Sequence, residues 1–118
     1  MKTRIKQTGD TTIIAMDGKL NHEIQEPLRR ELQKLAQQNL KTDSVAKIIF
    51  DFENLEFVGS SGISSFVQTL KEFSHRLPNK PRYCHVRSEF QKFMKALDEN
   101  DLFEFYETEE RAKNAFDQ

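Results

Sequence analysis

Hydrophobic and polar positions follow two kinds of pattern that alternate along the chain. Short segments rich in β-branched and aromatic residues lie at 11–16, 45–52, 82–86 and 103–107. Between them, apolar residues recur at offsets of three and four, as in an amphipathic helix. These helical stripes run through residues 24–36, 63–73 and 90–97. The pattern therefore predicts strands that alternate with helices.

Two further elements complete the expected order β-β-α-β-α-β-α-β-α. A polar segment at 3–7 predicts an edge strand that pairs antiparallel with its neighbour, and Thr108, Glu109 and Glu110 predict the cap and acidic first turn of a short terminal helix. Crossover helices between strands favour a mostly parallel sheet. We expect an α/β fold with a four- to five-stranded mixed sheet and about four helices, mainly on one face.

The centre of this sheet and some element boundaries can also be predicted. The run 48–50 (IIF) is apolar on both faces, as in a central strand, so we expect Ile48 and Phe50 to be buried. Gly18 is expected to end the strand that precedes it. Ser88 and Gln91 have the spacing of a capping box at the start of a helix.

Composition narrows the class of protein. A chain of 118 residues fits one domain, which we assign to residues 1–118. The net charge of -1 and charged fraction of 31% give a surface of mixed sign, unlike a nucleic-acid-binding surface. Charged residues interrupt the first 20 positions, so no signal peptide or membrane insertion is expected. The lone Cys84 excludes an internal disulfide, and a cytoplasmic location is expected.

The segment 50–63 (FDFENLEFVGSSGI) carries the clearest functional pattern. A buried strand is expected to end near Phe52, and a helix to begin near Ser60 after a short loop. The free N–H groups and the dipole at a helix N-terminus favour an anion, so a phosphate on Ser60 or Ser61 would be stabilised there. On physical grounds alone, however, a serine at this position is more often a plain helix cap.

No catalytic or metal-binding constellation can be assembled from spacing. The three histidines, His22, His75 and His85, match no metal-ligand motif, and we interpret them as surface or edge residues. Cys84 lies in a strand pattern and is expected to be a small packed side chain. Asp51 is interpreted as an acceptor that organises a loop. We therefore expect no enzyme activity, no cofactor and no bound metal.

The same segment resembles the signature of the STAS family, whose anti-sigma-factor antagonists carry an aspartate-led strand end followed by a Ser-Ser-Gly turn. The matching residues are Asp51, Phe52, Leu55, Phe57, Val58, Ser60, Ser61, Gly62 and Ile63. Residues 17–21 (DGKLN) resemble the family's turn before the first helix, and residues 88–106 resemble its third helix and last strand. The sequence departs from the family at Gly59 and Asn21, where the family usually has aspartate.

The resemblance implies a protein-binding switch. An anti-sigma factor that is also a serine kinase, of the histidine-kinase-like ATPase type, would bind the unmodified domain and phosphorylate Ser60, with Ser61 as the alternative. A serine phosphatase would restore binding. The expected partner surface comprises Asn21, His22, Phe57, Val58, Gly59, Ser60, Ser61 and Gly62. The missing carboxylates leave an alternative, a STAS adaptor subunit of a signalling or transport assembly that is not phosphorylated.

Overall fold

The computed structural model describes residues 2–9, 11–20, 25–40, 47–57, 63–76, 80–98 and 102–116. The strands are β1 (Lys2–Thr8), β2 (Thr11–Leu20), β3 (Lys47–Asp51), β4 (Leu55–Phe57), β5 (Arg82–Cys84) and β6 (Glu104–Tyr106). The helices are α1 (Gln25–Leu40), α2 (Ile63–His75), α3 (Ser88–Ala96) and α4 (Glu109–Phe116). Among the described helices, none has the length and apolar character needed to cross a membrane.

The strands form a mixed sheet in the order β1-β2-β3-β5-β6, with β4 beside the far end of β2. β1 pairs antiparallel with β2, while the other described pairings are parallel. The expected edge strand and the α/β fold class are thus confirmed. The sheet has six strands because residues 55–57, which the sequence predicted as loop, form the short strand β4.

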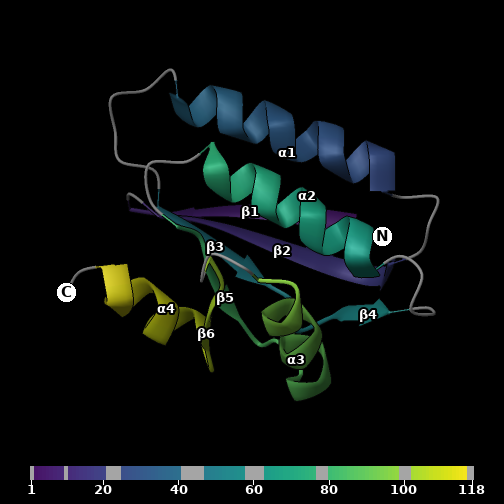
Figure 1. Cartoon of the computed structure of the whole chain (residues 1–118). Coiled ribbons are helices and arrows are strands. Elements are labelled where there is room, and N and C mark those ends of the chain that lie inside the picture. Colours follow the sequence, from purple (N-terminus) through teal and green to yellow (C-terminus); the bar gives the residue numbers. More distant parts are fainter. Residues whose placement is uncertain are drawn as a thin grey trace.

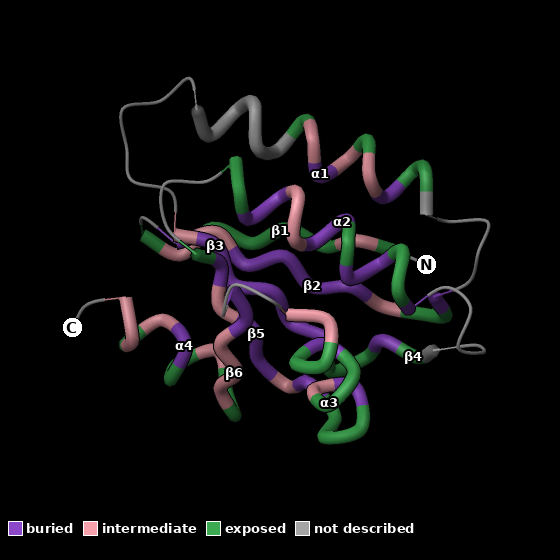
Figure 2. Tube along the Cα trace, in the orientation of Figure 1, coloured by how far each residue is buried: buried purple, intermediate pink, exposed green. Residues whose placement is uncertain are grey.

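One face of the sheet carries the main hydrophobic core. α1 and α2 lie along this face (Figure 1), and buried side chains of α1, α2 and α3 pack in the same apolar cluster. Ile48 and Phe50 are 1% and 0% exposed, which confirms their central position. Phe50 stacks on its register partner Tyr83 with ring centroids 5.2 Å apart. Figure 2 shows the burial concentrated in β2, β3 and β5.

The opposite face carries a smaller cluster under α4. Because side chains alternate along a strand, Ile49 points away from the core that holds Ile48 and Phe50. It packs with Ile13, Cys84 and Ala112, the last from α4. Three helices therefore contribute to one face and α4 covers the other, as expected for helices mainly on one side.

Gly18 does not end a strand, contrary to the sequence-based expectation. β2 continues to Leu20 and changes partner, pairing with β3 as far as Ala15 and with β4 from Gly18 onward. Gly18 has a φ of 109°, a conformation that a residue with a Cβ rarely adopts. Its N–H donates to the carbonyl oxygen of Asn54 at 2.9 Å. Gly18 thus lies at the point where β2 changes its parallel partner from β3 to β4.

The helix caps agree with the sequence in one case and differ in another. Thr108 caps α4 as predicted, since its hydroxyl accepts the N–H of Arg111 at 3.1 Å. The capping box predicted at α3 is wrong. Ser88 is already the first helical residue, and the N-cap Arg87 makes no side-chain cap. Gln91 instead donates its side-chain amide to the carbonyl oxygen of Val86 at 2.9 Å.

Candidate functional site

The two segments that lead to α1 and α2 leave the sheet at neighbouring points. β2 ends at Leu20 and β4 ends at Phe57, and these two residues are register partners in a parallel pair. α1 then begins at Gln25 and α2 at Ile63. The chain segments that precede α1 and α2 therefore start from neighbouring positions at one end of the sheet.

The predicted phosphorylation and partner-binding residues fall between these ends. Phe57 is the last residue of β4, and only its backbone is described. The others lie outside the described residues: Asn21, His22, Val58, Gly59, Ser60, Ser61 and Gly62. Their roles stay predictions, and the structure specifies only the elements that hold the two ends of each loop.

Those elements are anchored by the main core. Leu20 at the end of β2 is 2% exposed and Leu55 at the start of β4 is 1% exposed. Ile63, the first residue of α2, is 7% exposed and packs in the same cluster. On the surface, Asp17 accepts from the Asn54 amide at 3.2 Å and pairs with Arg4. The elements at the ends of both loops are therefore held in place by packing in the main hydrophobic core.

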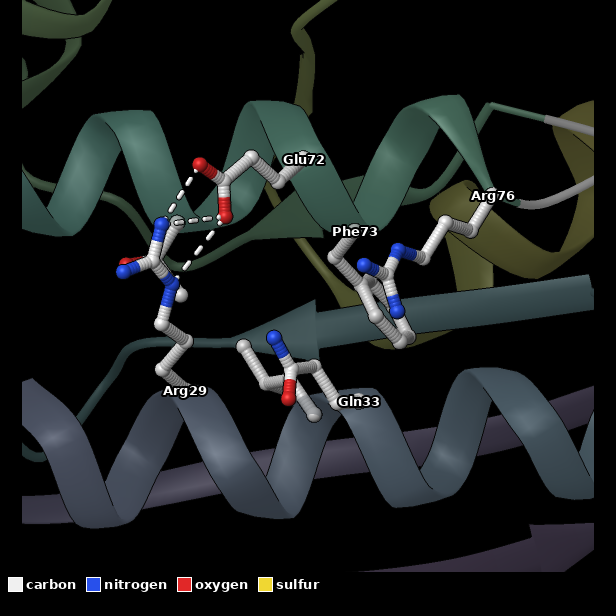
Figure 3. A pocket seen from close by; sticks show the side chains of 7 residues that line it. Arg29, Gln33, Glu72, Phe73 and Arg76 are labelled. Carbon is white, nitrogen blue, oxygen red and sulfur yellow. Dashed lines mark hydrogen bonds and ion pairs between the residues drawn. The ribbon is translucent and has the colours of Figure 1, made fainter.

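A side-chain clamp joins the two helices that follow the loops. Arg29 of α1 makes a forked interaction with Glu72 of α2, with its Nη2 2.7 Å from Oε1 and its Nε 3.1 Å from Oε2. The hydrogen bond from Arg29 lowers the pKa of Glu72. Figure 3 shows the hollow beside this pair, which also involves Gln33, Phe73 and Arg76. Its volume of about 10 Å³ holds at most one water, so it is not a ligand site.

A polar group on the α4 face was not foreseen from the sequence. Asp51 accepts the N–H of Glu53 at 3.0 Å, in agreement with its expected role as a loop-organising acceptor. Its Oδ1 also lies 3.0 Å from Nδ1 of His85. Burial raises the pKa of Asp51, but hydrogen bonds with Glu109, the Glu53 amide and His85 together outweigh burial and lower it.

Two further side chains complete this group. A hydrogen bond with Asp51, together with burial and the Asp51 charge, raises the pKa of Glu109 in the first turn of α4. Burial, together with Asp51, Glu109 and Glu53, raises the pKa of the Cys84 thiol and keeps it protonated. Cys84 is the packed side chain expected, whereas His85 is only partly exposed and engaged with Asp51. The spacing of these residues along the sequence did not indicate that they would lie close together.

Comparison with protein families matches residues 2–112 to the STAS domain. Comparison with curated proteins gave no match. Among solved structures, an anti-sigma-factor antagonist (STAS) domain protein from Planctomyces limnophilus has a TM-score of 0.75 at 19% identity, covering 96% of this chain and 95% of its own. The phosphorylated form of SpoIIAA, a Bacillus cell fate determinant, has a TM-score of 0.65 at 22% identity, covering 98% and 99%.

The unphosphorylated form of the anti-sigma factor antagonist SpoIIAA is similar, with a TM-score of 0.67 at 21% identity and coverage of 98% of both chains. At these identities the structural similarity establishes the fold, whereas the family match spans nearly all of the sequence. The resemblance seen in the strand, the Ser-Ser-Gly segment and the following helix is thereby confirmed at the level of the family. This chain belongs to the STAS domain family.

Proposed function

We propose that this chain is an anti-sigma factor antagonist whose binding to an anti-sigma factor is switched by phosphorylation of Ser60. The observation that carries the proposal is the position of the Ser-Ser-Gly segment. It lies between β4, which ends beside β2, and α2, whose first described residue is Ile63. The residues after Leu20 and after Phe57 would form one docking surface, comprising Asn21, His22, Phe57, Val58, Gly59, Ser60, Ser61 and Gly62.

Electrostatic effects indicate whether phosphorylation would strengthen or weaken partner binding. A phosphate adds roughly two negative charges at neutral pH. Near the start of α2, the free N–H groups would stabilise these charges while they face water. Transfer of the same charges into a desolvated protein interface is unfavourable unless they are paired. Phosphorylation of Ser60 would therefore release the partner, and a serine phosphatase would restore binding.

The similar structures support this proposal without extending to its details. They include anti-sigma factor antagonists, and one is described as the phosphorylated form. The proposed partner is an anti-sigma factor of the histidine-kinase-like ATPase type that also acts as the serine kinase. Such a function requires no catalytic group in this chain and places it in the cytoplasm, with sigma factors.

The test is the intact mass of the chain after incubation with ATP and the kinase encoded beside it. We expect one phosphate on the wild type and none on Ser60→Ala, while Ser60→Ala still binds the kinase. Ser64→Ala is the matched control, because Ser64 is an exposed serine in the first turn of α2 and should not affect labelling. Loss of the phosphate in Ser61→Ala instead would move the modified position by one residue.

Gly59 and Asn21 favour the alternative of a constitutive adaptor, since each replaces a carboxylate of the family pattern. Tight binding to the kinase without labelling of either serine would support the adaptor and contradict the switch. The variant Gly59→Asp provides a further test between the switch and the adaptor. If the missing carboxylate alone limits phosphorylation, this variant should be labelled faster than the wild type, with unchanged binding.

A further inference from the structure

The carboxyl ends of β3 and β5 bring together side chains of the types that bind transition metals. Asp51 and Cys84 are register partners in adjacent parallel strands and occupy the same face of the sheet. His85 follows Cys84, and consecutive strand residues normally point to opposite faces. His85 has a φ of 55°, which ends this alternation. Its Nδ1 consequently lies 3.0 Å from Oδ1 of Asp51.

The backbone conformation of His85 is a separate indication of a special role. A positive φ is uncommon for residues other than glycine, and such conformations cluster at functional sites. Here it places one donor atom from each of Asp51, Cys84 and His85 within 4.8 Å of the others. Ligand atoms around tetrahedral zinc are about 3.4–3.8 Å apart. The pair of Asp51 Oδ1 and His85 Nδ1, at 3.0 Å, would open slightly, and the widest pair would close by at most about 1 Å.

Charge around the three donors also favours a cation. The interaction with Asp51 raises the pKa of Glu109, and Oε2 of Glu53 lies 3.8 Å from Nδ1 of His85. Opposing charges also lie nearby, since Lys6 Nζ is 3.6 Å from Oε1 of Glu109 and the Arg4 guanidinium interacts electrostatically with Asp51 and Glu109. Three carboxyl groups thus surround one thiol and one imidazole, and a bound divalent cation would offset the excess of acidic groups.

We propose that Asp51, Cys84 and His85 bind a zinc ion. Glu109 lies outside this group of close donors, and its side chain would move to become the fourth ligand. Thiolate, imidazole and carboxylate together are a ligand set suited to Zn²⁺, and binding would release the proton of the Cys84 thiol. The ion would connect β3 and β5 to the first turn of α4. Cys84 and Asp51 are buried, but His85 and Glu109 are partly exposed, so an ion can enter from their side. The proposal departs from the expectation of no bound metal that was drawn from sequence spacing.

The experiment uses the isolated chain without an affinity tag, stripped of metal and titrated with Zn²⁺ by calorimetry and with Co²⁺ by absorption spectroscopy. We expect one equivalent to bind, and the cobalt form to show a thiolate charge-transfer band. Because Cys84 is the sole cysteine in the chain, this band identifies the ligand. Cys84→Ser should remove the band, and His85→Gln should weaken zinc binding by at least tenfold, at roughly the lower limit expected for a metal site.

His75→Gln is the matched control, since His75 is exposed on α2, the helix that packs on the other face. It should leave zinc affinity unchanged. His85→Gln changes a partly exposed side chain and keeps the result interpretable if Cys84→Ser fails to fold. The proposal is overturned if the wild type shows no charge-transfer band, or if His85→Gln binds zinc as tightly as the wild type does. Neither result depends on the anti-sigma factor or on Ser60.

Discussion

The two faces of the sheet are built from the same strands but from different chemistry. One face presents a row of large apolar residues, with Ile14, Phe50, Tyr83 and Phe105 side by side across four strands. One residue further along, the other face presents Ala15, Asp51, Cys84 and Tyr106. The first row is covered by helices α1 to α3, whereas the second meets only α4 among the described helices.

The contrast indicates a division of roles. The apolar face fixes the ends of β2 and β4 and the start of α2, and so holds the loops of the proposed switch. The α4 face contributes less apolar burial but contains the acidic group around Asp51. Polar groups can be kept there because hydrogen bonds among Asp51, His85 and Glu109 compensate for their burial. Stability should therefore depend mainly on one face and pH sensitivity on the other.

The largest expected effect comes from truncating the core of the apolar face. Phe66 of α2 is 0% exposed, and its ring centroid lies 5.7 Å from that of Phe52 and 6.0 Å from that of Phe90. Phe66→Ala should lower the free energy of unfolding by about 3–5 kcal/mol through lost burial and a residual cavity. The control Phe116→Ala, on the partly exposed ring of α4, should cost about 1 kcal/mol. Urea denaturation measures both, and equal losses would contradict the division between faces.

A smaller effect is expected where the apolar face depends on backbone conformation. Gly18→Ala forces a Cβ into a φ of 109° at the point where β2 passes from β3 to β4. The strain should lower the free energy of unfolding by about 1–3 kcal/mol. Lys19→Ala, at the exposed neighbouring position, should change it by less than about 0.5 kcal/mol. If the two variants are equally stable, β2 does not require this conformation.

The smallest effect concerns the pH dependence of the α4 face. The raised pKa of Glu109 means that the folded protein holds a proton which the unfolded chain releases. This contribution to stability is complete below the ordinary glutamate pKa of about 4.3 and is lost as the pH rises through the raised folded value. The lowered pKa of Asp51 has the opposite effect, making stability increase with pH. This effect of Asp51 should remain in a Glu109→Gln variant.

In metal-free buffer, the free energy of unfolding of Glu109→Gln relative to the wild type should therefore rise as the pH increases above about 4.3. The glutamine cannot lose a proton, yet it can still donate a hydrogen bond to Asp51. Glu110→Gln, at the exposed next position, is the matched control. A difference that stays constant with pH would show that folding does not raise the pKa of Glu109.

The sequence by itself determined the order of elements apart from β4, the edge position of β1, the buried centre at Ile48 and Phe50 and the family of the chain. These features follow from patterns within a few residues, because side-chain periodicity reports which face of a helix or strand is buried. The Ser-Ser-Gly segment belongs here too, since the proposed role of Ser60 comes from the sequence motif.

Only the tertiary structure decided that β2 serves two partners, that residues 55–57 form a strand, and that Asp51 meets Cys84 and His85. Asp51 and His85 are 34 positions apart, and no local pattern reports the register between β3 and β5. A shift of that register by one residue would place Cys84 on the opposite face from Asp51. Register is set by the packing of both faces together, and so emerges only when the whole sheet has formed.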